Sequence, residues 1–93
     1  MTVPELEQLR AEIDSIDRDI LRLVAERVRL VLRVGEVKRA RQMPVYDPAR
    51  EKDVLEKLSK SPPEPLDAAT VRSVFERLID ESRRIEQAHV SRG

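Results

Sequence analysis

The 93-residue sequence contains no cysteine, one histidine, two glycines and only 2% aromatic residues. The lack of cysteine excludes a disulfide framework and thiolate chemistry. The single histidine, His89, excludes a histidine-based metal cluster and a Ser-His-Asp arrangement. With 39% charged residues, the composition is typical of long, surface-rich helices rather than of a sandwich or barrel. The sequence therefore predicts an all-α fold.

An excess of charge of either sign and long apolar runs are also missing. Eighteen Lys and Arg residues balance eighteen Asp and Glu residues, so no overall field attracts nucleic acid or an acidic membrane. No apolar run approaches membrane-spanning length. The first residues lack the apolar core of a signal peptide. We therefore expect a soluble, cytoplasmic protein that binds neither nucleic acid nor a membrane.

Apolar residues recur every three or four positions from Leu6 to Val37, which predicts one face of a long helix. Pro4 suits the first turn and Pro44 stops the pattern, so the helix is expected over about residues 5–42. Its length would be roughly 57 Å, whereas a compact chain of this size has a radius of gyration of about 12 Å. The helix must therefore lie against a second copy or a partner chain.

Two shorter helices are predicted after the long one. Asp47 and Pro48 form a good helix start, so the second helix is expected over about residues 48–58. Prolines at 62, 63 and 65 break the chain, and Asp67 caps a third helix over about residues 67–89. The inward faces are predicted to contain Asp47, Arg50, Glu51, Val54, Leu55 and Leu58 on the second helix, and Val71, Val74, Phe75, Leu78, Ile79, Ser82, Ile85 and Glu86 on the third. One domain, residues 1–93, is expected.

Charged residues interrupt the buried face of the first helix. Its apolar series demands position 27, where the sequence has Arg27. A guanidinium there needs an anionic partner, which a register-fixing salt bridge or a bound ligand could supply. Lys38 follows eleven residues later, about three turns and roughly 16 Å along the same side, so both side chains can reach one small molecule. Arg10 is about 42 Å from Lys38 along the helix, so it can serve that site only from another chain.

Polar residues on the inward faces of all three helices favour a polar pocket in a helical scaffold. Each residue alone is more often a capping or surface residue. Two or three cations together indicate a ligand with more than one carboxylate. The predicted pocket residues are Arg27, Lys38, Asp47, Arg50, Glu51, Ser82 and Glu86.

Short motifs follow one another along nearly the whole chain in a specific order and spacing. They are Leu9–Asp14 with Ile16 and Asp17, Leu23–Arg27, Val34–Lys38, Val45–Glu51, and Phe75–Ile79 with Glu81 and Ser82. In this order they resemble the all-helical, type II chorismate mutases. The resemblance implies an intertwined homodimer with two equivalent sites, which converts chorismate to prephenate by a Claisen rearrangement in phenylalanine and tyrosine biosynthesis. It implies no metal and no cofactor.

The resemblance also assigns roles to individual residues. Arg10 of the neighbouring chain and Arg27 would bind the two substrate carboxylates, and Lys38 would contact a carboxylate and the ether oxygen. Asp47 and Glu51 would lie around the ring hydroxyl. Ser82 would contact a carboxylate, and Arg50 would have a supporting role.

Glu86 departs from the family pattern, because many members have a glutamine there that donates a hydrogen bond to the ether oxygen. A carboxylate cannot donate, but a protonated carboxyl can. We therefore expect Glu86 to act with Lys38 in catalysis in its protonated form, with burial favouring that form and Lys38 opposing it. Mutase domains fused to DAHP synthase resemble this chain in having glutamate there, which suggests an association with DAHP synthase.

Two alternatives stay open at this point. An isochorismate pyruvate lyase of the same fold would also use the cationic residues, although Asp47, Arg50 and Glu51 at mutase spacing argue against it. A non-catalytic regulatory or dimerisation module is the other. In a plain dimerisation element, Arg27 and Lys38 could be exchanged for Leu or Gln with no loss beyond stability.

Overall fold

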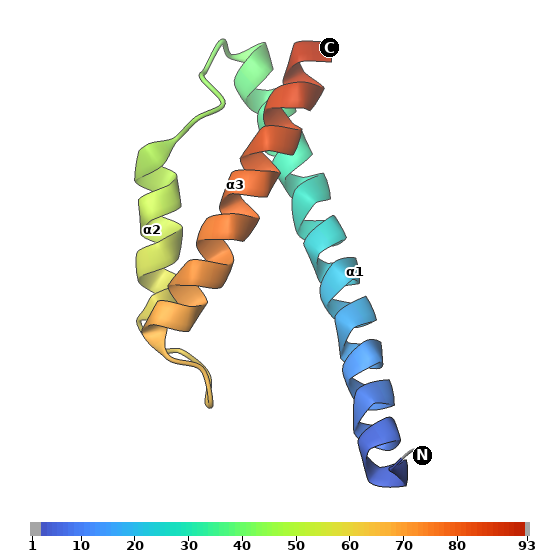
Figure 1. Cartoon of the computed structure of the whole chain (residues 1–93). Helices are drawn as coiled ribbons and strands as arrows, with labels where there is room; N and C mark the ends of the chain where they lie inside the picture. Colours follow the sequence, from blue (N-terminus) through green and yellow to red (C-terminus); the bar gives the residue numbers. More distant parts are fainter. Residues whose placement is uncertain (1–2, 93) are drawn as a thin grey trace.

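The computed structural model describes residues 3–92, and these residues form three α-helices and no strand (Figure 1). The helices are α1 (Pro4–Ala40), α2 (Pro48–Ser59) and α3 (Ala68–Arg92). The predicted all-α class, with one long, one short and one medium helix, is confirmed. Helix α1 ends two residues earlier than expected, because Gln42 takes a left-handed backbone conformation with φ of 57°. Helix α3 runs three residues further than expected.

Both predicted aspartate caps are confirmed. At the start of α2 the Asp47 carboxylate accepts a hydrogen bond from the backbone N–H of Arg50 at 3.0 Å. At the start of α3 the Asp67 carboxylate accepts one from the N–H of Thr70 at 2.7 Å. This interaction with Thr70 lowers the pKa of Asp67. An aspartate next to a helix start satisfies a backbone donor that has no partner inside the helix.

Helix α3 packs against both other helices, meeting the C-terminal half of α1 on one side and α2 on the other (Figure 1). The interior is small. Within residues 3–92 the buried residues are Gly35, Val71, Ile79, Ser82 and Glu86. Two of these side chains are polar or charged, so a single chain has almost no apolar core.

The N-terminal half of α1 extends away from the other helices (Figure 1). The molecule is 59 Å long and its radius of gyration is 17.2 Å, well above the roughly 12 Å of a compact chain this long. Leu9, Ile13, Ile16 and Ile20 are each between 51% and 57% exposed on this segment. One chain therefore leaves a long apolar stripe of α1 in water. None of the helices within residues 3–92 is long and apolar enough to span a bilayer.

The side of α1 that meets α3 differs from the predicted apolar series. Leu30, Val34 and Val37 are exposed, whereas Arg27 and Lys38 are half-buried. The predicted apolar series was expected to lie against a second chain, so its exposure in one chain leaves that prediction untested. Leu30 and Val34 line the same cavity as Arg27 and Lys38, so apolar and charged positions share this side of α1.

Two apolar residues predicted to face inward are exposed in the single chain, as is Arg50. Leu58 on α2 is 39% exposed and Val74 on α3 is 58% exposed. Helical spacing gave these positions the same face as their buried neighbours. Within residues 3–92 no other segment covers that part of α2 or α3, so the prediction does not hold for either residue in a single chain.

Candidate active site

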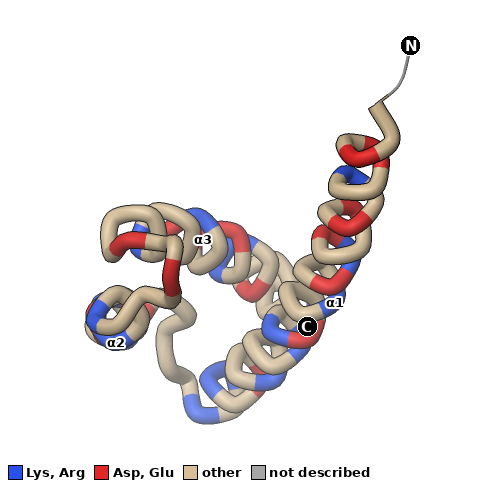
Figure 2. Tube along the Cα trace, turned by 90° about the horizontal axis from the view of Figure 1, so that it is seen from below, with Lys and Arg blue, Asp and Glu red and all other residues tan. Residues whose placement is uncertain are grey.

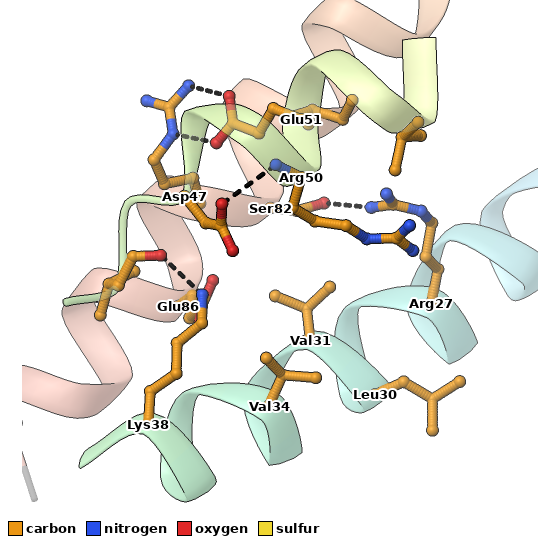
Figure 3. Close-up of a pocket in the computed structure, with 14 residues that line it drawn as sticks. Arg27, Leu30, Val31, Val34, Lys38, Asp47, Arg50, Glu51, Ser82 and Glu86 are labelled. Atoms are coloured by element: carbon orange, nitrogen blue, oxygen red, sulfur yellow. Dashed lines mark hydrogen bonds and ion pairs between the residues drawn. The ribbon is translucent and has the colours of Figure 1, made fainter. Parts of the chain in front are cut away.

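A cavity of about 270 Å³ lies between the three helices (Figure 3). Its wall includes seven of the eight predicted site residues: Arg27, Lys38, Asp47, Arg50, Glu51, Ser82 and Glu86. Apolar side chains from all three helices complete it, among them Val31, Val54 and Ile79. Figure 2 shows positive and negative positions on all three helices.

Arg10 is the predicted site residue that does not line this cavity. It is exposed on the N-terminal half of α1, which Figure 1 shows projecting away from α2 and α3. Lys38 follows it by 28 residues on the same helix, a distance of about 42 Å. Arg10 therefore cannot reach the cavity of its own chain.

Arg27 enters the cavity from α1 without a carboxylate partner within the described part of the chain. Its Nη1 donates to Ser82 Oγ at 3.2 Å, and that hydroxyl donates onward to the Leu78 carbonyl at 2.7 Å. Burial lowers the pKa of Arg27, and the positive charge of Arg50 lowers it further. A half-buried cation that faces a second cation and contacts only a hydroxyl is electrostatically unsatisfied. The site is therefore suited to an anion.

Lys38 and Glu86 meet at the other end of the cavity. The Lys38 ammonium donates to the Val45 carbonyl at 2.7 Å and to Glu86 Oε2 at 3.5 Å. Their side chains are only 14% and 7% exposed. An ammonium has three donors, so one N–H of Lys38 is left for a ligand. Figure 3 shows the Lys38 ammonium at the edge of the cavity.

Helix α2 supplies the wall opposite α1. One oxygen of Asp47 caps the helix, which leaves the other as an acceptor toward the cavity. The exposed Arg50 side chain pairs with Asp53 at 3.3 Å. Glu51 is held by Arg83 of α3 through two hydrogen bonds of 2.8 and 3.2 Å. Sequence reasoning missed Arg83, although its position directly after Ser82 placed it at the edge of the inward face of α3.

Gly35 allows α1 and α3 to approach closely beneath the site. A Cβ at this position would lie 2.9 Å from Cγ of Glu86 and 3.1 Å from Cγ2 of Val90. Real Cβ atoms essentially never come within 3.0 Å of a non-bonded heavy atom elsewhere in the chain. The missing side chain of Gly35 is thus what lets Glu86 lie against α1, within reach of Lys38.

Gly35→Ala is expected to destabilise the fold by about 1–2 kcal/mol. Overpacking costs about 1–3 kcal/mol, and the better helix propensity of alanine returns up to about 1 kcal/mol. Chemical denaturation measures the difference. The same substitution in a Glu86→Ala background should cost less, because the atom that clashes is gone. Equal costs in the two backgrounds would show that Glu86 is not the obstacle.

The described residues offer binding groups but no nucleophile paired with a base. Within residues 3–92 no group of three or more His, Cys, Asp or Glu side chains could hold a metal ion. His89 lies outside the cavity, with Nε2 at 3.1 Å from Glu36 Oε1. The arrangement of cations on one side and acceptors on the other can bind, orient and stabilise charge.

Comparison with known families connects this geometry to a reaction class. The sequence model of the family described as chorismate mutase type II matches residues 9–87, which is most of the chain and includes every cavity-lining residue. The chain belongs to the type II chorismate mutase family. The resemblance carried by the sequence motifs is therefore confirmed.

Individual relatives agree with this membership. The chorismate mutase of Methanocaldococcus jannaschii is 32% identical over 89 residues, which cover 95% of this chain and 90% of that protein. The bifunctional chorismate mutase/prephenate dehydratase of Aquifex aeolicus is 48% identical over 54 residues, 58% of this chain. That match spans only 15% of the Aquifex protein, so the chain corresponds to a small part of this longer relative.

A solved structure resembles this chain over almost its whole length. The crystal structure of the Helicobacter pylori chorismate mutase in complex with prephenate matches with a TM-score of 0.88 and 27% identity. The match covers 96% of this chain and 97% of that one. The same three-helix arrangement therefore occurs in a protein with prephenate bound.

Proposed function

We propose that this chain catalyses the Claisen rearrangement of chorismate to prephenate. The observation that carries the proposal is the unsatisfied positive charge of Arg27 in a cavity that it shares with Lys38. Chorismate has two carboxylates, and a half-buried arginine is the preferred partner of such a group. Family membership and the prephenate complex of the Helicobacter pylori relative support the same substrate.

The reaction needs orientation and charge stabilisation rather than a nucleophile. It is unimolecular, so holding the folded conformer of the substrate removes much of the barrier. Arg27, supported by Ser82, would bind one carboxylate, and Arg50 adds positive charge nearby. The free N–H of Lys38 would donate to the ether oxygen, where negative charge grows as the C–O bond breaks. The free oxygen of Asp47 would accept from the ring hydroxyl.

A homodimer in which Arg10 of the second copy completes each cavity is part of the proposal. The apolar stripe of α1 is exposed in one chain, and so is Arg10 on the same half of the helix. A second α1 running alongside would cover the stripe and bring its own Arg10 to the cavity, whereas a single chain cannot. The buried residues of one chain are too few to stabilise a fold of this size.

Incubation of the purified protein with chorismate tests the function directly. We expect chorismate to disappear and prephenate to form. Isochorismate is the second substrate to try, because a lyase of this fold would release pyruvate from it instead. Chorismate binding without turnover would contradict the enzyme and favour a regulatory module. The suggested association with DAHP synthase stays a prediction, which copurification of the two proteins would test.

We propose that Glu86 donates a hydrogen bond to the ether oxygen in its protonated form. Its Oε2 lies 3.5 Å from Lys38 Nζ, so both groups can reach one ligand atom. The charged residues of other helices that line the same cavity are Arg27 and Lys38 on α1 and, on α2 and its cap, Asp47, Arg50 and Glu51. His89, three residues further along α3, pairs with Glu36 instead. Glu86 is 5% exposed, which leaves the carboxyl little water to bond with.

The donor role requires the kcat/KM of the parent to fall once the carboxyl has lost its proton, a requirement that Glu86→Gln does not have. A carboxyl donates only while it has its proton, whereas an amide donates at every pH. kcat/KM should be measured for both proteins over about pH 5 to 9, where lysine side chains ordinarily keep their charge. Glu81→Gln, on an exposed turn of α3, is the matched control and should follow the parent profile. Identical profiles for the parent and Glu86→Gln would exclude the donor role.

A further inference from the structure

Arg83 joins three parts of the molecule at the outer wall of the cavity. Its guanidinium donates to both oxygens of Glu51 on α2, at 2.8 and 3.2 Å, and to Asp80 on its own helix at 2.7 Å. It also lies over the ring of Tyr46, with Cζ 5.0 Å from the ring centroid. The hydrogen bond with Glu51 raises the pKa of Arg83. Its side chain is 27% exposed, so water screens these contacts only in part.

These contacts fix the acceptor side of the cavity. A bidentate arginine–carboxylate pair holds the plane of the carboxylate as well as its position. Each Glu51 oxygen keeps a lone pair, so the carboxylate can still accept a hydrogen bond from a ligand hydroxyl. Tyr46 lies between Val45, whose carbonyl accepts from Lys38, and Asp47, which caps α2. The stacked arginine therefore also restrains the segment that orients Lys38.

We propose that Arg83 is a positioning residue that sets the preference of this site for a substrate with a hydroxyl on its ring. It does so by holding Glu51 as an oriented, charged acceptor. The inference rests on the proposed function, since it assumes that the hydroxyl of chorismate meets this wall. Arg83 itself need not touch the substrate.

Arg84 is a natural control for Arg83. It is the next residue on α3 and makes a similar ion pair three residues back, with Glu81 at 2.8 Å. Its side chain is 69% exposed, against 27% for Arg83. Arg84→Met thus removes one arginine from the same turn of the helix without disturbing the cavity wall.

The test compares Arg83→Met and Arg84→Met on chorismate and on an analogue whose ring hydroxyl is replaced by hydrogen. Arg83→Met should lower kcat/KM for chorismate about ten- to a hundredfold and change it little for the analogue. Arg84→Met should match the parent on both. Arg83→Lys keeps the charge but not the two-point contact, so it should restore only part of the loss. In a Glu51→Gln background, Arg83→Met should have little further effect.

The outcomes separate this inference from the function beneath it. If the parent rearranges chorismate while Arg83→Met loses equally on both substrates, Arg83 is merely structural and the inference is wrong. Unchanged kinetics of Arg83→Met would overturn it too. Failure of the parent to rearrange chorismate would overturn the proposed function and the inference with it. Thermal denaturation of each variant shows whether a loss follows unfolding.

Discussion

Lys38→Ala should lower kcat for chorismate by about 10²- to 10³-fold, the cost of removing one donor to an oxygen that gains charge. Lys38 is the residue placed to donate to that oxygen, since two of its three N–H groups already go to Val45 and Glu86 and aim the third into the cavity. The substitution also removes the 3.5 Å contact that Lys38 makes with the nearly buried Glu86. The decrease in kcat is measured by following chorismate disappearance at saturating chorismate.

Two further variants make the result for Lys38 interpretable. Lys57→Ala removes an exposed lysine of α2 that pairs with Asp53, and it should leave kcat unchanged. Lys38→Arg keeps the charge but offers a planar fork in place of a compact ammonium, so it should recover little activity. A decrease of less than about tenfold for a folded Lys38→Ala protein would show that the ether oxygen is stabilised by another group.

Mixing two inactive variants should restore activity if each cavity uses Arg10 of the other copy. Arg10→Ala and Lys38→Ala are each expected to lose about 10²-fold or more. A mixed dimer would have one site that lacks both residues and one site that has both. After random exchange of chains, about a quarter of the parental activity should return, since half of the dimers are mixed and half of their sites are intact.

The pair Arg27→Ala and Lys38→Ala provides the control for this mixing experiment. Both residues line the cavity of the same chain, so every site in their mixed dimers lacks one of them. No activity should return in that mixture. Recovery there, or none with Arg10→Ala, would contradict a site shared between chains. Chains that do not associate at all, as judged by sedimentation, would contradict the dimer itself.

Local signals in the sequence were sufficient for the elements. Asp47 and Asp67 cap α2 and α3 as predicted, because a cap depends only on the few residues that follow it. The motifs around Arg27 and Lys38 also placed the right side chains at one cavity. The spacing of residues on a helix fixes which of them share a side, and that information is enough to bring such groups together.

Contacts between helices were harder to predict, because periodicity does not say which neighbour covers which side. Val34 and Lys38 line the same cavity, yet Val34 is 50% exposed whereas Lys38 is half-buried beneath α3. The ion pair of Arg83 with Glu51 joins residues 32 positions apart, and no sequence pattern around either residue predicts it. The sequence also does not show that Gly35 lies against Glu86 of another helix.

The interior of this chain largely coincides with the wall of its cavity. Ser82 and Glu86 occupy positions at which most small helical proteins have leucine or isoleucine. Apolar side chains at these two positions would stabilise the helix packing but would remove polar groups that the proposed reaction uses. Stability and activity therefore cannot both be increased by substitutions there. Additional stability has to come from outside the cavity, along the exposed apolar stripe of α1.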